Sequence, residues 1–482
     1  MSFAAFRSVV ACLAIAFSLW VLESARNGVE ITPASIKDTP VTRYASPDAD
    51  GQVILIAHGF AGSQQMMQGY ALPLARAGYQ VYSFEFLGHG RHRVPMSGDV
   101  SAIDGTTRLL MEQTSAVIDA LGQGRPDIGL LGHSMATDIL VRVAENRSDI
   151  GPMVLVSAFS QKITANHPPN LLLITGAWEA GLRSFALSAV QMIDPDASES
   201  KTVRAGPLIR RAVAAPFAEH ASILQSRVAR REATDWFDAA YGRAAGHQIL
   251  PTGWAILGLL AGLVLLFPTV ARQIPHKAAH APLTRGRLAL LCLLPTCLTP
   301  FLALPLKMEV LPVLVADYLA LHLAIFGVIQ LVILRRWAIP FGAIDLRALV
   351  LLLSFCALFG VALDRYAANF WPTPERVWII AAIALGAIPY MLADAAIAHN
   401  SGWLGRFGLR SSLLGSLGIA VLLDFEGLFF LLMIAPVLVL FYMVFATMGR
   451  ACSLRSGPLS AGLALGLVLA WALGVSFPMF QA

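Results

Sequence analysis

The sequence predicts a protein in two parts, in which an α/β domain with a mostly parallel sheet precedes an all-α membrane domain. Between residues 45 and 248, short apolar and often β-branched runs alternate with longer segments of helical patterning. This alternation is typical of parallel sheets with crossover helices. After residue 252 the chain consists largely of apolar runs near the ~20 residues that a helix needs to cross a bilayer.

The composition requires that part of the chain lies in lipid. Of its 482 residues, 56% are hydrophobic and 13% are charged, and the mean hydropathy of +0.66 is too high for a wholly soluble protein. The net charge is only +5, and the arginines occur mainly in short loops between apolar runs. We therefore expect the lipid bilayer as a partner and no nucleic acid. All five cysteines lie in or beside apolar runs, so the α/β domain has no disulfide framework.

Nine apolar runs predict nine membrane crossings. The first, residues 8–22, follows Arg7 and predicts an anchor over residues 6–24, because no strong small-x-small cleavage site follows it. The other eight predict a membrane domain over residues 252–480. They lie near 252–270, 288–306, 309–334, 346–364, 376–397, 409–424, 427–447 and 458–478.

Arginine-bearing loops predict the orientation of the chain. Positive charge favours the cytoplasmic side, so an even number of crossings must separate any two of these loops. The interval from Arg410 to Arg450 then needs two spans, with Asp424 and Glu426 at an external turn. Counting back places residues 25–250 outside, so we expect a multi-pass protein of the plasma (inner) membrane with an external or periplasmic α/β domain. The loops carry Arg272, Lys277, Arg285 and Arg287; Arg335, Arg336 and Arg347; Arg406 and Arg410; Arg450 and Arg455.

The chemistry is expected at the carboxyl ends of the predicted strands, where parallel sheets place their ligand sites. Gly132-His133-Ser134-Met135-Ala136 follows the predicted strand 128–133 and precedes a helical run over 135–147. A strand-turn-helix context with small neighbours is what a nucleophile elbow requires, because the backbone must turn sharply to expose the serine hydroxyl. Ser134 is therefore the candidate nucleophile. The other strands are expected at 52–58, 80–86, 152–158 and 171–176.

A second glycine-rich motif, His58-Gly59-Phe60-Ala61-Gly62, ends an earlier strand. Glycines there free the backbone to point N–H groups at a tetrahedral oxyanion, so we expect Phe60 and Met135 to supply the two donors. His58, Gly59, Gly132 and His133 would support the motifs. A third motif, Phe86-Leu87-Gly88-His89-Gly90-Arg91, is expected to be structural.

These three motifs, H-G-F-x-G, F-L-G-H-G-R and G-H-S-M-A, resemble the α/β-hydrolase superfamily, and most closely its serine aminopeptidase and monoglyceride-lipase-like branch. The resemblance covers roughly residues 50–243. It implies the chain order nucleophile, acid, histidine. The family's G-x-x-D acid motif matches Gly176-Ala177-Trp178-Glu179, which makes Glu179 the favoured acid, with Asp194 and Asp196 as the alternatives.

The resemblance also places the histidine after the last strand, which Arg211–Ala215 would form, and His220 fits there as the general base. His133, His167 and His247 follow no strand in the right place. We expect no metal and no cofactor.

The sequence departs from the family in two ways, of which the first is conservative and the second alters the substrate expectation. Ala136 stands where glycine is usual, and only ten residues, 161–170, separate two strands between which lidded relatives insert a helical cap. We therefore expect an α/β-hydrolase domain without a cap. It would be a membrane-bound serine hydrolase that cleaves an ester or amide through Ser134, His220 and Glu179 and an acyl-enzyme intermediate. We expect a small-molecule or lipid ester as its substrate, and favour a lipid or another membrane-associated substrate. The alternative is a transporter or lipid-handling protein whose hydrolase-like domain only binds.

The membrane domain contains an internal echo of one short pattern. Pro312-x3-Ala316-Asp317-x4-His322 recurs as Pro389-x3-Ala393-Asp394-x4-His399, on two spans of the same direction. Ionisable residues within a membrane are costly and often mark function. We expect Asp317 and His322 to face the interior of the bundle, while chance similarity explains the echo as well as a true repeat does.

Overall fold

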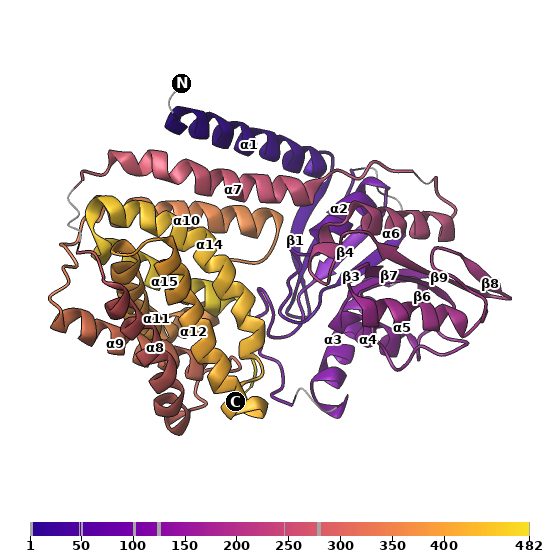
Figure 1. Cartoon of the computed structure of the whole chain (residues 1–482). Helices are drawn as coiled ribbons and strands as arrows, with labels where there is room; N and C mark the ends of the chain where they lie inside the picture. Colours follow the sequence, from indigo (N-terminus) through magenta and orange to yellow (C-terminus); the bar gives the residue numbers. More distant parts are fainter. Residues whose placement is uncertain are drawn as a thin grey trace.

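The computed structural model describes residues 3–47, 49, 52–99, 103–122, 127–244, 246–276 and 281–481. An α/β domain lies at one end of a bundle of long helices (Figure 1). The α/β fold with a mostly parallel sheet and the apolar helical part both confirm the predicted fold class.

The sheet has nine strands in the order β1-β2-β4-β3-β5-β6-β7-β9-β8. Strands β4, β3, β5, β6, β7 and β9 are parallel, and their carboxyl ends therefore share one edge. The antiparallel strands β1 and β2 extend the domain toward the N-terminus from its expected start at residue 45. The strands are β1 Glu30–Ile36, β2 Thr39–Ala45, β3 Val53–Ala57, β4 Gln80–Phe84, β5 Ile128–His133, β6 Ile150–Val156, β7 Asn170–Gly176, β8 Val203–Ala205 and β9 Leu208–Ala215.

Helices cover both faces of the sheet, which explains why β3 and β5 are continuous apolar runs with every residue buried. Helices α2 (Gln68–Arg76) and α6 (Arg227–Ala240) pack on one face, and α3 (Arg108–Leu121), α4 (Met135–Ala144) and α5 (Ala180–Gln191) pack on the other. The amphipathic α6 illustrates the principle, because it buries Ala229, Ala233 and Phe237 at a spacing of four residues.

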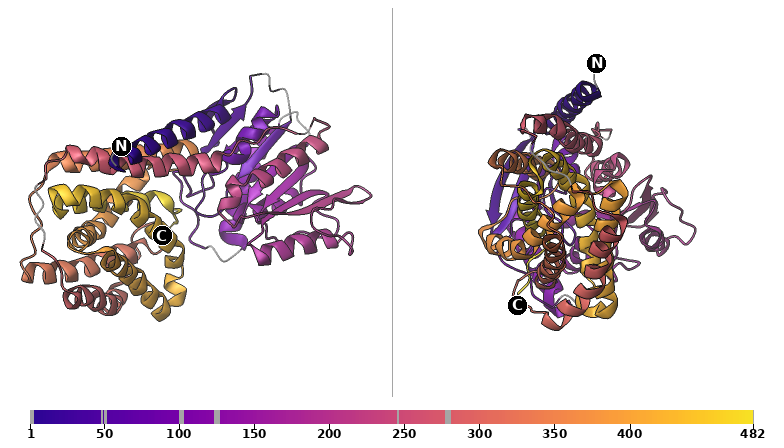
Figure 2. Two further views of the ribbon diagram at one scale, coloured as in Figure 1. Left: turned by 45° about the horizontal axis from the view of Figure 1, so that its top comes forward. Right: turned by 60° about the vertical axis from the view of Figure 1, so that its left-hand side comes forward.

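Within the described residues, nine helices are long and apolar enough to cross a membrane. The first of them, α1, lies along α7 in all views (Figures 1 and 2). Asp424 separates α12 from the short α13, and its carboxylate accepts from Gly427 N, so the chain breaks where the external turn was expected. The helices are α1 Phe3–Arg26, α7 Thr252–Val270, α8 Arg285–Ala303, α9 Ala316–Arg336, α10 Leu346–Tyr366, α11 Pro374–His399, α12 Trp403–Leu423, α13 Phe425–Leu428, α14 Leu431–Ser456 and α15 Pro458–Ser476.

The arginine-bearing loops gather at the end of the bundle away from the α/β domain (Figure 1). Ala281 N donates to Asn400 Oδ1 at 2.8 Å, and Arg455 Nε donates to Ile274 O at 2.5 Å, so three of these loops touch one another. At the opposite end, Lys307 pairs with Asp424 at 3.2 Å. The arginine-bearing loops thus lie together at one end of the bundle, as an even number of crossings between them requires.

The two segments that share the repeated pattern have different structures. His322 is fully buried and contacts Tyr318 Oη at 3.2 Å and Ser416 Oγ at 3.0 Å, which confirms that it faces the interior. The expectation for Asp317 is wrong, because its carboxylate accepts from the N–H groups of residues 310 and 311 and thereby ties down the loop before α9. Pro312 lies in that loop whereas Pro389 lies inside α11, so the two segments are not equivalent in structure.

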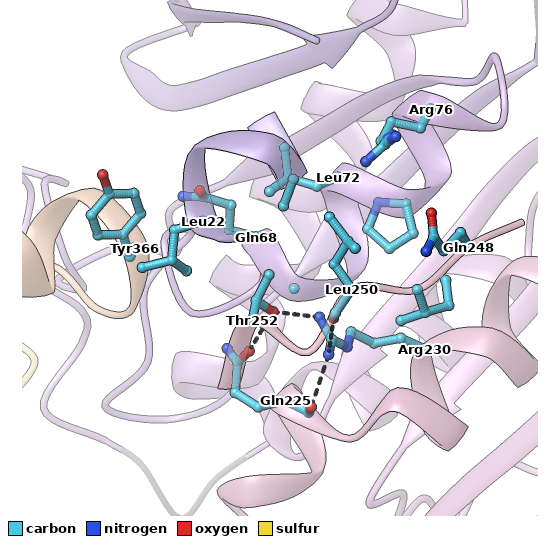
Figure 3. Close-up of a pocket in the computed structure, with 14 residues that line it drawn as sticks. Leu22, Gln68, Leu72, Arg76, Gln225, Arg230, Gln248, Leu250, Thr252 and Tyr366 are labelled. Carbon is cyan, nitrogen blue, oxygen red and sulfur yellow. Dashed lines mark hydrogen bonds between the residues drawn. The ribbon is translucent and has the colours of Figure 1, made fainter. Parts of the chain in front are cut away.

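Arg230 stabilises the junction between the α/β domain and α7 through hydrogen bonds (Figure 3). This guanidinium is 2% exposed and donates to Thr252 Oγ1 at 2.6 Å, Leu250 O at 3.1 Å and Gln225 O at 3.0 Å. Burial lowers the pKa of Arg230 to about 10, and no carboxylate offsets that cost in these contacts. The small pocket beside it has a volume of about 30 Å³, which has room for water but not for a substrate.

Candidate active site

Ser134 lies in a sharp turn between β5 and α4. Its φ of 54° and ψ of −120° are unusual for a residue with a side chain, and they lift the hydroxyl out of the sheet. The turn requires small neighbours, since a Cβ at Gly132 would lie 2.7 Å from Leu140 Cδ1. The fully buried Ala136 fits at the position where the related family prefers glycine.

Three of the residues singled out from the sequence form one chain of hydrogen bonds. His220 Nε2 lies 2.8 Å from Ser134 Oγ, and His220 Nδ1 lies 2.7 Å from Glu179 Oε1. Ser134 follows β5, Glu179 follows β7 and His220 follows β9, so all three lie on the carboxyl edge of the sheet. The alternative acid Asp194 instead pairs with Lys201 at 3.7 Å.

The carboxylate of Glu179 is held in its ionised form. Burial acts to raise its pKa, but hydrogen bonds from His220, Gly176 N and Ser157 Oγ outweigh burial, and the net pKa lies below its usual value. Gly176 N and Ser157 Oγ both donate to Oε2, at 2.6 Å and 2.8 Å. The sequence analysis missed Ser157, although its position just after β6, beside the strand that carries the acid, is the signal that would have identified it.

Two neighbours hold the backbone of His220. The buried His133 ring donates from Nε2 to His220 O at 2.9 Å, and burial, foremost among its causes, lowers the pKa of His133 to about 4. This histidine is therefore neutral at pH 7. The carboxylate of Glu219 accepts from Ala221 N at 3.0 Å and Ser222 N at 2.7 Å, which fixes the turn on the other side of His220.

The glycine-rich loop after β3 lies directly against the nucleophile. A Cβ at Gly59 would be 2.9 Å from Ser134 Cβ, so only glycine allows this approach. Met135 opens α4, where the first backbone N–H groups have no acceptor within the helix. The structure therefore brings the loop that contains Phe60 next to Ser134, the residue that directly precedes α4.

A buried carboxylate that the sequence analysis did not single out supports this loop. Glu85 is fully buried, and its Oε2 accepts from Gln64 N and lies 3.2 Å from His58 Nε2. His58 Nδ1 donates to Gly59 O at 2.8 Å. A glutamate inside the otherwise apolar run QVYSFEF was the available signal.

A cleft of about 320 Å³ opens beside Ser134 and His220. Half of the His220 side chain is exposed to solvent. The connection between β6 and β7, residues 157–169, is described throughout and contains no helix, so no cap covers the cleft from there. The cleft is lined by Thr107, Ser134, Met135, Asp138, Ile139, Arg142, Ser157, Phe159, Gln161, Leu182 and His220.

The other histidines considered lie elsewhere. His247 Nε2 is 3.4 Å from Asp238 Oδ2 near the end of α6. His167 lies on the connection between β6 and β7 and contacts Val141 O in α4. Among the described residues, no cluster of three or more His, Cys, Asp or Glu side chains has the arrangement of a metal site.

Comparison with known proteins gives one family match and several similar structures. Residues 48–235 match the family described as serine aminopeptidase, S33. Similar solved structures include a CIB-like hydrolase from Thermoplasma acidophilum, at 15% identity over 44% of this chain and 98% of that one with a TM-score of 0.35. Epoxide hydrolases from Vigna radiata and from an endophytic Streptomyces match at 20% and 22% identity, each over 27% of this chain and with a TM-score of 0.23. The chain covers only 41% and 38% of those two enzymes. None of the curated proteins compared matches the chain.

Proposed function

Because residues 48–235 match the serine aminopeptidase, S33, family, we propose that the chain is a membrane-bound serine hydrolase that cleaves an ester or amide through Ser134, His220 and Glu179. The hydrogen-bonded chain from Glu179 through His220 to Ser134 carries this proposal. A domain that only binds has no need of a nucleophile, a base and an acid in hydrogen-bond contact.

The proposed reaction follows from the atoms in contact. Ser134 Oγ attacks the carbonyl carbon while His220 Nε2 takes the hydroxyl proton, and the N–H groups of Phe60 and Met135 stabilise the oxyanion. The bond to the leaving group then breaks as His220 delivers the proton to it, leaving an acyl ester on Ser134. Water, deprotonated by the same histidine, releases the acid. Glu179 holds the imidazole in the required tautomer and stabilises its charged form.

The direction in which the site faces supports a membrane-associated substrate. Loops on the carboxyl edge of the sheet contact the helical bundle, since Ser63 Oγ accepts from Asn369 N at 3.0 Å and Arg91 pairs with Asp364 at 2.5 Å. The edge that carries Ser134 therefore faces the membrane domain. Holding a site beside the bilayer raises the effective concentration of lipids there.

Three exposed aromatic side chains, which we call the aromatic rim, surround the catalytic groups. Phe159, Trp178 and Phe217 are 56%, 66% and 84% exposed and follow β6, β7 and β9 respectively. Exposed aromatic groups at this density are costly in water but suit the interface between water and lipid. The rim and the largely apolar, uncapped cleft favour an acyl ester of a lipid over a small soluble ester.

The same orientation leads us to propose an external or periplasmic location for the hydrolase domain. The domain lies at the end of the bundle opposite the arginine-bearing loops, and such loops favour the cytoplasmic side. The protein would then be a multi-pass protein of the plasma (inner) membrane whose hydrolase domain acts at the outer leaflet.

Labelling with a fluorophosphonate probe tests the catalytic proposal. Membranes that contain the full chain should be labelled, and Ser134→Ala should abolish the signal; equal labelling of both proteins would overturn the proposal and favour the binding alternative. Kinetics then test the substrate class. We expect kcat/KM to be higher for a long-chain lipid ester in vesicles than for a short-chain soluble ester, and Phe217→Ser to reduce that preference. A preference for the soluble ester would rule out the lipid assignment.

A further inference from the structure

Residues 477–481, which follow α15 and which we call the tail, pack into the hydrolase domain beside the site. Met479 N donates to Gly88 O at 2.9 Å, Met96 N donates to Met479 O at 2.8 Å and Gln481 N donates to Met96 O at 2.6 Å. Gly88 is required there, because a Cβ at this position would lie 2.3 Å from Met479 O. The motif that contains Gly88 therefore receives the tail.

Phe480 is part of the hydrophobic core of the hydrolase domain. Its side chain is 4% exposed and belongs to the cluster that includes Phe86, Met96 and Ala57, on the face of the sheet covered by α3, α4 and α5. Its backbone N–H donates to Pro312 O at 2.7 Å, which links the tail to the loop before α9. A residue of the C-terminus thus completes a core built from residues before 215.

The same tail contacts the loop that approaches the nucleophile. The ring of Phe60 lies with its centroid 6.3 Å from Phe480 and 5.8 Å from Phe430, both in the membrane domain. His89 meets it edge-on at 5.7 Å. Three aromatic rings from outside the loop therefore pack against Phe60, one of the two residues whose backbone N–H groups we assign to the oxyanion.

A buried arginine fastens the tail in this position. Arg376 is fully buried and donates to Phe477 O at 2.7 Å, to Gly474 O at 3.0 Å and to Gly88 O at 2.8 Å. One guanidinium therefore joins the end of α15, the start of the tail and the hydrolase domain. This clamp limits movement of the tail relative to the site.

We propose that residues 477–481 are a positioning element of the hydrolase, in which Phe480, together with Phe430, orients Phe60 so that its N–H points at the oxyanion. The proposal rests on the proposed hydrolase function. Ala61 has a φ of 53° and Gly62 N bonds to Gly59 O, so the loop is a tight turn. The rings packed on Phe60 act on its orientation together with the hydrogen bonds of His58 and Glu85. Phe480 touches no reacting atom and acts only through Phe60.

Phe480→Ala in the full-length protein, purified in detergent, tests the proposal against a matched control. Gln481→Ala is the control, because it changes an exposed side chain one residue further along the same tail and keeps the backbone contact to Met96. Rates are measured with a soluble ester and expressed per fluorophosphonate-titrated site, so that unfolded protein does not count. Binding of a boronic acid, whose tetrahedral adduct requires the oxyanion donors, is measured in parallel.

Removal of an oxyanion donor costs about 10²–10³ in kcat, so displacement of one should cost about 10-fold to 100-fold. We expect that loss in Phe480→Ala, a comparable weakening of the boronic acid, KM within about threefold and partial rescue in Phe480→Leu. Unchanged kcat per site and unchanged boronic acid binding would overturn the proposal. If Phe480→Ala does not fold, Phe430→Ala takes its place and must show the same pattern. Absence of labelling in the wild type would instead refute the hydrolase function itself.

Discussion

Replacement of Glu179 by glutamine should inactivate the enzyme without unfolding it. Both oxygens of the carboxylate face donors, with His220 Nδ1 at Oε1 and the pair Gly176 N and Ser157 Oγ at Oε2. A glutamine has only one acceptor oxygen. Because two donors occupy the Oε2 side and one occupies the Oε1 side, the amide oxygen should take the Oε2 position and turn the NH2 group toward His220.

That orientation selects the wrong tautomer of the base. An NH2 group at 2.7 Å needs an acceptor, so Nδ1 of His220 must lose its proton and Nε2 must carry one. A protonated Nε2 cannot take the proton of Ser134. In the Ser-His-Asp template the corresponding change costs about 10⁴ in kcat. Since half of the His220 side chain is exposed and water can compete for it, we expect a loss of about 10³ to 10⁴, or roughly 4 to 5.5 kcal/mol of transition-state stabilisation.

Steady-state kinetics on a soluble ester, together with the thermal midpoint of unfolding, measure the effect. Glu145→Gln is the matched control, since that carboxylate is exposed and pairs with Lys162 at 3.3 Å. Glu179→Gln should keep its thermal midpoint within a few degrees and lose kcat, while the control keeps both. Retention of more than a tenth of kcat in Glu179→Gln would refute the assignment of the acid and direct attention to Asp194 and Asp196.

Three further predictions concern stability and orientation. Because burial lowers the pKa of His133 to about 4 from about 6.5 in an unfolded chain, the unfolded state binds the proton first as the pH falls. The contribution of neutral His133 to the free energy of unfolding, on the order of 3 kcal/mol, should be complete above about pH 6.5 and lost between about pH 6.5 and 4. In a plot of the thermal midpoint against pH, His133→Gln should reduce the slope between these two pH values. An unchanged slope would contradict the reasoning. Arg230→Met leaves several buried acceptors unpaired and should cost about 2–4 kcal/mol of unfolding free energy in a thermal melt, whereas the exposed neighbour Arg231→Met should cost little. Equal losses in the two variants would argue against a stabilising role of Arg230 at the junction with α7. An alkaline phosphatase fused after Gly242 should be active and one fused after Leu283 silent, and the reverse pattern would invert the proposed topology.

The sequence alone determined the features that depend only on residues close together along the chain. Apolar runs of spanning length, β-branched strands and the small residues around Ser134 are local patterns, because burial in lipid or between two layers of helices acts on every residue of a segment. The chain order of the family then indicated Glu179 and His220 as partners of Ser134. Strands β1 and β2 escaped notice because β1 is largely exposed and carries no apolar pattern.

Only the tertiary structure decided which distant groups meet. The family's motif favoured Glu179 over Asp194 and Asp196, but only the pairing of the strands brings a particular carboxylate, that of Glu179, to the His220 ring. Likewise, Ser157 and Glu85 support the site only because parallel strands bring their carboxyl ends to one edge. The contact of Phe480 with Phe60 joins a tail to a loop near the other end of the chain. Such contacts leave no periodic pattern, because they depend on how two domains pack and not on the repeat of a helix or strand.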